Sequence, residues 1–199
     1  MTGTPAVSGA SVAFSLNGVG WTPVTGTSSL IGNGRSIATD GKQWVVGGTD
    51  SRPIYNTNVY GGGTWSQVSS GEWPISNVSD MRIVDIKWNG RQWILVVNNN
   101  TSSGDTVAIS TDGISWTTVR NKGNFDNGQS AMWNSYAWFV TGTSGTASQT
   151  TLYSKDGGST WPNAETTAGS FSIASRTITG TFFNVVPYIN VRDFGAIGD

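Results

Sequence analysis

Residues 83–97 read Ile-Val-Asp-Ile-Lys-Trp-Asn-Gly-Arg-Gln-Trp-Ile-Leu-Val-Val, two largely apolar runs separated by the pair Asn89-Gly90. The second run is long enough for a buried strand and far too short to cross a membrane as a helix. Asn-Gly supplies the positive φ angles that a tight hairpin needs. We therefore predict two antiparallel strands, residues 83–89 and 93–97, joined at Gly90.

The same arrangement recurs along the chain. Three segments place Trp four positions after an Asp or Asn that opens a turn, at residues 40–44, 89–93 and 134–138. Four segments of a second kind, also ending in Trp, alternate with them along the chain, at residues 15–21, 58–65, 110–116 and 154–161. Because self-similarity at a fixed period determines architecture before local propensity does, the fold is expected to be built by repetition.

The spacing of these segments predicts the fold class. Successive Trp residues of the second kind lie 44, 51 and 45 residues apart, and those of the first kind 49 and 45. Repeats of roughly 40–50 residues with four short strands are typical of β-propeller blades. We predict an all-β chain of four-stranded antiparallel blades, with structural turns at Asn17, Gly18, Asp40, Gly41, Asn89, Gly90, Asp112, Gly113, Asp156 and Gly157.

The two ends of the chain look like two halves of one blade. Residues 12–14 and 21–24 match strands three and four, and residues 178–186 match strands one and two, with Phe183 placed after Gly180 as Trp44 is after Gly41. We predict a small four-bladed ring closed by pairing these ends, which removes free sheet edges. The expected domains are an N-terminal arm (1–10), the propeller (11–187) and a linker or docking tail (188–199).

Composition narrows the classes of function. Charged residues make up 12% of the chain and the net charge is −1, so neither nucleic acid nor an anionic membrane is an expected partner. The chain contains no Cys and no His, which removes disulfides, thiolate metal sites and the commonest general base. We expect no metal and no cofactor.

Two resemblances carry the functional interpretation. The segments at 110–116 and 154–161 resemble the Asp-box (BNR) repeat, Ser-x-Asp-Gly-x-x-x-Trp with small variation in length. The copy at 15–21 has Asn17 in place of Asp, and the copy at 58–65 has Tyr60 there. Residues 190–199 are similar to the segment that opens the pectate-lyase-like β-helix of phage tail spikes and viral fibres. The second likeness implies the N-terminal module of a larger fibre or spike; alternatively, this tail docks onto a partner.

Catalysis is not expected. Asp-box proteins include sialidases, and the resemblance would imply an arginine clamp on the substrate carboxylate and a Tyr nucleophile assisted by Glu. The Asp-boxes themselves resemble structural turns far from any active site. The glutamates here are Glu72 and Glu165, each in an expected loop, and the arginines at 35, 82, 91 and 176 have no spacing that forces them together. We predict that the chain is not an enzyme and that Asp112 and Asp156 accept backbone hydrogen bonds in their turns.

The Trp residues are expected to form the core. Seven of the ten fall at repeat positions, and Trp88 and Trp133 share another, so burial explains them without a ligand. Trp73 is the exception, because it lies outside the repeat in a long loop. With that loop we group the other mixed aromatic and charged loops as a candidate binding surface, represented by Arg52, Tyr55, Trp73, Lys122 and Phe125.

The leading interpretation is a structural module of a virion. It would join a downstream β-helix to the particle or take part in host-surface adsorption, on the tail or capsid surface, with other virion proteins and a cell-surface glycan as partners and a homotrimeric parent protein. The alternative is a stand-alone lectin-like propeller, and a sialidase-like glycoside hydrolase comes third. Glycan binding that is lost in Trp73→Ala would favour the lectin.

Overall fold

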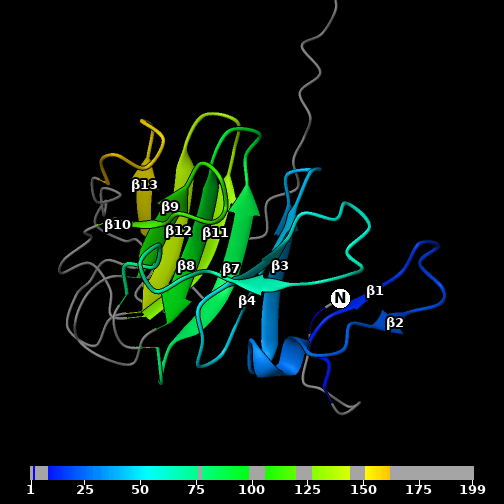
Figure 1. The fold of residues 1–199 in the computed structure, drawn as a ribbon. Coiled ribbons are helices and arrows are strands. Elements are labelled where there is room, and N and C mark those ends of the chain that lie inside the picture. Colours follow the sequence, from blue (N-terminus) through cyan, green and yellow to red (C-terminus); the bar gives the residue numbers. More distant parts are fainter. Residues whose placement is uncertain are drawn as a thin grey trace, which may run out of the picture.

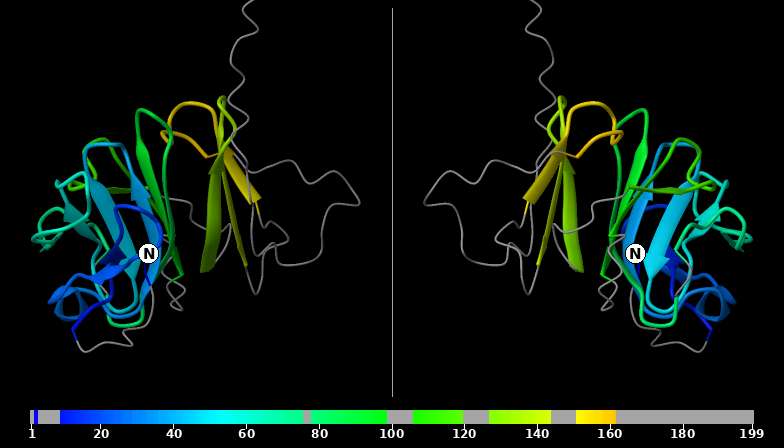
Figure 2. Two further views of the ribbon diagram at one scale, coloured as in Figure 1. Left: turned by 90° about the vertical axis from the view of Figure 1, so that its right-hand side faces the viewer. Right: turned by 90° about the vertical axis from the view of Figure 1, so that its left-hand side faces the viewer.

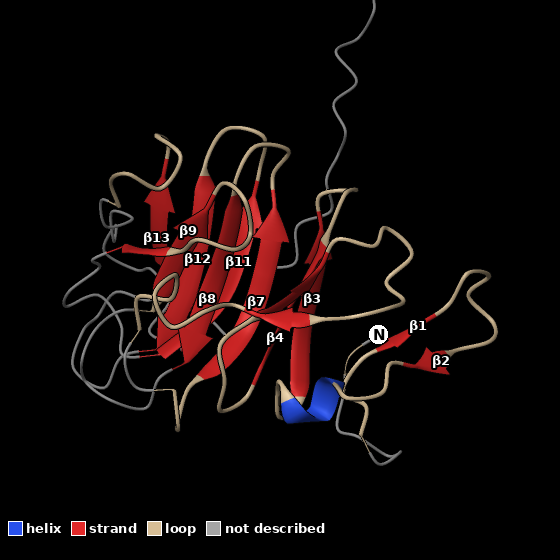
Figure 3. Ribbon diagram, in the orientation of Figure 1, coloured by secondary structure: helices blue, strands red, loops and turns tan. Residues whose placement is uncertain are grey.

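The computed structural model describes residues 2, 9–75, 78–98, 106–119, 127–143 and 151–161. The described part is built from antiparallel strands and one short 3-10 turn, Thr27–Ser29 (Figure 3). None of the helical structure within these ranges is long and apolar enough to cross a membrane. The prediction of an all-β chain is therefore confirmed.

Three units of strands follow one another along the chain. The first unit has the strand order β3-β4-β5-β6, the second β7-β8-β9-β10, and the third β11-β12-β13. A single pairing, Asn127 with Asn98, joins the third unit to the second. The strands are β3 (Gly34–Thr39), β4 (Trp44–Gly48), β5 (Ile54–Asn56), β6 (Ser66–Gln67), β7 (Arg82–Trp88), β8 (Trp93–Asn98), β9 (Val107–Ser110), β10 (Thr117–Val119), β11 (Asn127–Trp133), β12 (Trp138–Thr143) and β13 (Thr151–Ser154).

A separate N-terminal hairpin, β1 (Ala13–Phe14) with β2 (Thr22–Pro23), precedes the first unit. Figures 1 and 2 show the units side by side in a curled arc, with this hairpin at one end and β13 at the other. The two strands predicted for residues 83–89 and 93–97 and the predicted N-terminal half-unit are thus confirmed. The partner strands predicted within residues 178–186 lie outside the described residues, so four blades and ring closure stay predictions, as do the domain boundaries.

Apolar side chains fill the space between neighbouring units. One cluster joins the first and second units around Val45, Trp93 and Trp116, and a second joins the second and third units around Ile94 and Trp138. A third lies between the N-terminal hairpin and the first unit. Each fully buried indole removes roughly 150–250 Å² from water, a gross stabilisation of about 4–6 kcal/mol.

Most repeat-position Trp residues lie in these clusters, as predicted. Trp93 and Trp138 are fully buried, and Trp65 and Trp116 are nearly so. Trp44 and Trp161 are half-buried and pack on their clusters. For Trp21 the prediction of burial is wrong, since 44% of this residue is exposed. In the second unit the equivalent hairpin, β9 with β10, is extended by β8 and β7. Among the described strands, the hairpin β1 with β2 has no such extension.

Two turn glycines show how the units contact one another. Gly113 has φ +71°, and an added Cβ would lie 2.5 Å from Nε2 of Gln43 in the first unit, whereas Gly90 has φ +93° and open space around it. We expect Gly90→Ala to lower the free energy of unfolding by about 1 kcal/mol through backbone strain. Gly113→Ala adds a steric clash and should cost about 1 kcal/mol more. If urea denaturation gave the same loss of unfolding free energy for Gly90→Ala and Gly113→Ala, the close approach of Gln43 to Gly113 would be contradicted.

Candidate functional site

The turns of the first kind are held by their own Asp or Asn side chain. In each, the side-chain oxygen accepts hydrogen bonds from the backbone amides two and three residues later, at 2.7–3.0 Å. These residues therefore replace backbone partners inside the hairpin. They are Asp40, Asn89 and Asn134.

The second kind of turn adds a serine hydroxyl. Asp112 Oδ1 accepts from the amides of Ile114 and Ser115 at 2.8 and 2.7 Å, and the Ser110 hydroxyl lies 2.9 Å from the same oxygen. Asn17 makes the equivalent amide contacts, at 2.9 and 3.0 Å, so an amide oxygen serves as well as a carboxylate here. Asp112 therefore holds its turn through backbone amides of that turn.

These hydrogen bonds also lower the pKa of the two aspartate carboxyls, Asp112 and Asp156. Partial burial on its own raises the pKa of Asp112, but the amides of Ile114 and Ser115 and the Ser110 hydroxyl outweigh burial and hold the pKa below its ordinary value. At Asp156, hydrogen bonds from the hydroxyl and amide of Thr160, and from the Ser154 hydroxyl, lower the pKa to about 2. Both groups are anionic acceptors at neutral pH, so neither is suited to donate a proton.

We expect the Asp156 carboxyl to titrate at a pKa of about 2 instead of the ordinary 3.8. Because the folded value is the lower one, the contribution of Asp156 to stability is complete above about pH 4 and is lost as the pH falls through about 2. Carbon-detected NMR of the side chain would measure the midpoint. Thr160→Val should move it towards 3.8, and a midpoint near 3.8 in the unaltered chain would contradict the assignment.

The turn at 58–65 departs from the other copies. Tyr60 occupies the position of the missing Asp and is 68% exposed. Asn58 Oδ1 accepts from the Tyr60 amide at 3.0 Å, and Asn56 Nδ2 donates to the Gly62 carbonyl at 2.9 Å, so two asparagines hold this longer turn. In two of the other copies the Trp Nε1–H donates to a glycine carbonyl of the turn, as Trp116 does to Gly113 at 3.2 Å. Trp65 makes the same contact, with the Gly61 carbonyl at 3.3 Å.

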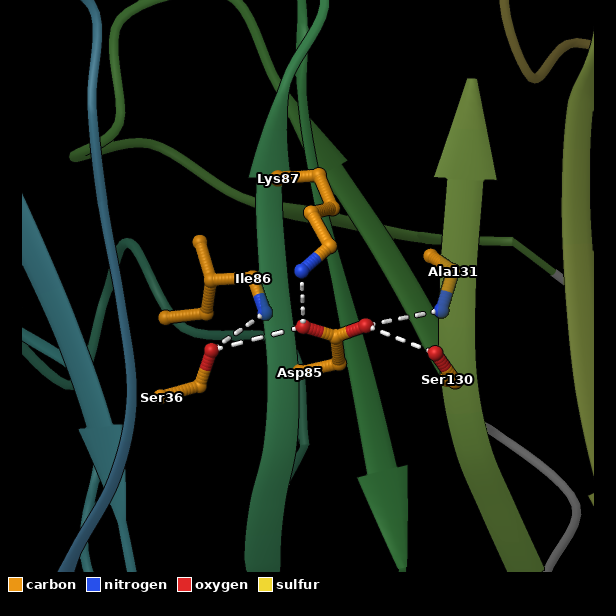
Figure 4. Close-up of polar contacts among 6 residues, drawn as sticks. All are labelled: Ser36, Asp85, Ile86, Lys87, Ser130 and Ala131. Carbon is orange, nitrogen blue, oxygen red and sulfur yellow. Dashed lines mark hydrogen bonds and ion pairs between the residues drawn. The ribbon is translucent and has the colours of Figure 1, made fainter. Parts of the chain in front are cut away.

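A buried carboxylate, Asp85, lies where the first strands of the three units run side by side (Figure 4). Its Oδ2 accepts from the Ser130 hydroxyl and the Ala131 amide of β11, both at 3.0 Å. Its Oδ1 lies 2.9 Å from Lys87 Nζ and accepts from the Ser36 hydroxyl of β3 at 3.4 Å. The Ser36 hydroxyl in turn accepts from the Ile86 amide at 2.9 Å. This cluster, Ser36, Asp85, Lys87 and Ser130, is called the axial clamp below.

Irregular strands place the axial clamp. The pairing register shifts between Gly34 and Ser36, between Ile83 and Asp85, and between Gly128 and Ser130, which is one bulge at the same place in each first strand. A bulge turns the following side chain out of the regular alternation. Ser36 and Asp85 can then reach an amide or hydroxyl of the next unit.

Sequence reasoning missed the axial clamp, although a signal was present. Ser36, Asp85 and Ser130 each stand four residues before the Asp or Asn of a first-kind turn. A polar residue at a fixed repeat position inside an apolar strand marks a shared buried contact. Both carboxylate oxygens of Asp85 are occupied by donors, so the arrangement joins three units and leaves no lone pair aimed at a substrate.

The five residues of the predicted binding surface do not form one described surface. Lys122 and Phe125 lie outside the described residues. Arg52 donates to the Gln67 side chain at 2.9 Å, and Tyr55 is half-buried in β5. The expectation that Trp73 stands apart from the core is wrong: it is 6% exposed and packs edge-on against Trp116, with ring centroids 6.4 Å apart.

An apolar cleft of about 120 Å³ lies beside the N-terminal hairpin. No charged side chain lines it, and aromatic rings dominate its walls. The lining residues are Val12, Ala13, Phe14, Ser15, Trp21, Ile37, Trp44, Tyr60, Gly61 and Trp65. Among the described residues, no group of three His, Cys, Asp or Glu side chains is placed to hold a metal ion.

Comparisons with known proteins support the fold. No protein-family model matches the chain, and no curated protein sequence matches it. A Niastella koreensis GH74 enzyme is similar in structure, with a TM-score of 0.53 and 17% identity over 72% of this chain and 24% of that enzyme. YCF48 bound to D1 peptide matches at a TM-score of 0.47 and 15% identity, over 65% of this chain and 40% of the other. This chain thus spans about a quarter of the GH74 enzyme.

The GH74 enzyme is a β-propeller-type protein, so the curled antiparallel arrangement agrees with a propeller-type fold. The prediction that the chain is not an enzyme is contradicted, because a glycoside hydrolase, the GH74 enzyme, has a similar fold. At 17% identity this likeness shows the fold alone and assigns no catalytic residue to the chain.

Proposed function

We propose that this chain is a β-propeller module of a phage or viral tail fibre or spike. The observation that carries the proposal is the segment Asn190-Val191-Arg192-Asp193-Phe194-Gly195, which resembles the opening of a pectate-lyase-like β-helix. A repeated, Cys-free β module with few charges ahead of a β-helix is consistent with an extracellular fibre. The module would join the β-helix to the particle or contribute to adsorption on the host surface.

The second-kind turns support an Asp-box interpretation of the propeller. Ser110 and Asp112, and again Ser154 and Asp156, make the serine–carboxylate contact within the turn, at 2.9 and 2.7 Å. In the proposal the three described units are three blades of a four-bladed ring, and the N-terminal hairpin is half of the fourth. Residues 178–186 supply its other half.

The axial clamp favours a rigid mounting function. Through Asp85 it joins the first strands of all three described units by charge-assisted hydrogen bonds, which are stronger than neutral ones. A fibre base must transmit force without its blades separating. In the proposal, the partners are other virion proteins and a host-surface glycan, the location is the tail or capsid surface, and the parent protein is a homotrimer.

Electron microscopy of intact particles tests the proposal. Antibodies raised against this chain should label the tail or the capsid surface of purified virions. The reading frame beyond Asp199 should continue with β-helix repeats. Absence of label on particles, or a continuation without such repeats, would overturn the proposal.

A further inference from the structure

The sequence contains four Asn-Gly pairs, and the structure gives each pair a different environment. In such a pair the glycine nitrogen can attack the side-chain amide carbon of the asparagine, because glycine has no side chain to obstruct the attack. The attack needs an accessible glycine nitrogen and an asparagine side chain that lies beside it. The pairs are Asn17-Gly18, Asn33-Gly34, Asn89-Gly90 and Asn127-Gly128.

The turn at Asn89-Gly90 meets both needs. Gly90 is exposed, open space surrounds the position of a Cβ atom, and no described residue accepts a hydrogen bond from its amide. The Asn89 Oδ1 atom accepts from the amides of Arg91 and Gln92 at 3.0 and 2.7 Å, which holds the side-chain carbonyl against its own turn. These two amides also face the oxygen that gains negative charge when a nucleophile adds to Cγ, as the donors of an oxyanion hole do.

In two other turns a side-chain hydroxyl covers the glycine amide. The Gly18 amide donates to the Ser15 hydroxyl at 2.9 Å, and the Gly41 amide donates to the Thr39 hydroxyl at 3.0 Å. The attack requires the glycine nitrogen to lose its proton and turn towards Cγ, which breaks such a bond. At the position of Thr39 the second unit has Trp88, whose indole offers no hydrogen-bond acceptor.

The other two Asn-Gly pairs are held by the sheet. The Asn33 amide donates to the Thr49 hydroxyl, and the Asn33 carbonyl accepts from the Thr49 amide, each at 3.1 Å. Gly128 is buried, and an added Cβ would lie 2.3 Å from the Val96 side chain. Neither backbone can move towards the side-chain carbon without breaking these contacts.

We propose that Asn89 is a site of spontaneous deamidation, and the first of the four Asn-Gly pairs to react in the folded protein. The Gly90 nitrogen bonds to Cγ of Asn89, the Cγ–Nδ2 bond breaks, and ammonia leaves with the proton that Gly90 gave up. One water molecule then opens the five-membered imide. Cleavage of the new N–Cγ bond gives aspartate, and cleavage of the original peptide bond gives isoaspartate.

The two products should differ in their effect on the fold. Aspartate is the residue that the first unit carries at this position, where Asp40 accepts from the two equivalent amides. Isoaspartate adds one methylene to the backbone and displaces Gln92, whose Oε1 accepts from Trp138 Nε1 of the third unit at 3.3 Å. The isoaspartyl form should therefore weaken the contact between the second and third units, which a lower urea midpoint than that of the aspartyl form would measure.

Peptide mapping by mass spectrometry of the full chain, incubated at mildly alkaline pH, tests the proposal. In the folded chain, deamidation should be roughly five- to tenfold faster at Asn89 than at Asn17, since one more hydrogen bond must break at Gly18. In urea the rates at the four pairs should converge, because only the folded structure distinguishes them. Ser15→Ala should raise the rate at Asn17 towards that at Asn89, and Gly90→Ala should slow Asn89 alone.

The order of the rates decides the proposal. Reaction at Asn89 first in the folded chain, together with convergence in urea, supports it. Reaction first at any of the other three pairs, or equal rates in the folded chain, would overturn it. The same order in urea as in the folded chain would also overturn it, by showing that the sequence alone sets the rates. If Ser15→Ala does not fold, the unaltered chain with and without urea provides the comparison by itself.

Discussion

Replacing Asp85 with alanine is expected to lower the free energy of unfolding by about 3–4 kcal/mol, since hydrogen bonds to a charged group contribute about 1.5–3 kcal/mol each. The substitution removes the acceptor for the Ser130 hydroxyl and the Ala131 amide, and leaves that amide unpaired where the units meet. Urea denaturation followed by Trp fluorescence would measure the loss as a lower midpoint with an unchanged slope.

Lys87→Met is the matched control for Asp85→Ala. The Lys87 side chain is 43% exposed, so its ion pair with Asp85 should contribute less than about 1 kcal/mol. Asp85→Asn should fall between the two, because its amide keeps one acceptor oxygen for β11 but presents donors to Lys87. Equal losses in Lys87→Met and Asp85→Ala would show that the ion pair, and not the contact between units, carries the stability.

The local part of the fold could be predicted from sequence because its interactions are local. A turn such as Asp40–Gln43 is closed by a side chain and amides two and three residues away, so the residue types alone specify it. The strands predicted for residues 83–89 and 93–97 followed from the same kind of turn together with apolar runs. Repetition at a fixed period then extended one well-defined unit to the others.

The contacts between units were not predicted, because their partners are distant in sequence. Asp85 reaches Ser36 across 49 residues and Ser130 across 45. Only alignment of the repeats against one another would have placed these three polar residues at one level. The repeat also led to a wrong prediction of burial at Trp21, since a repeat position is buried only where a neighbouring unit covers it.

Trp73 shows the opposite error, because it lies outside the repeat and yet is part of the core. Its loop crosses from the first unit to the second, and the Glu72 carbonyl accepts a hydrogen bond from the Trp116 amide at 3.0 Å. This contact draws the following indole beneath the second unit. Neither propensity nor period shows such a docking, because the loop is irregular and its partner lies 44 residues further along.

Trp73→Ala is therefore expected to cost about 3–5 kcal/mol of unfolding free energy, as for other large-to-small substitutions of buried aromatic residues. The indole packs against Trp116 and lies in the cluster that joins the first and second units. Differential scanning calorimetry and urea denaturation would measure the loss. Tyr136→Ala, at a residue 65% exposed, should change stability by about 0.5 kcal/mol or less.

Trp73→Phe separates packing from surface recognition. The Trp73 Nε1–H has no hydrogen-bond partner among the described residues, so phenylalanine keeps much of the apolar contact and removes an unpaired donor. We expect Trp73→Phe to cost less than about 1.5 kcal/mol. It follows that a glycan signal lost in Trp73→Ala reports unfolding unless Trp73→Phe loses it too. Selective loss of glycan binding in a fully stable Trp73→Ala variant would contradict the core position of this residue.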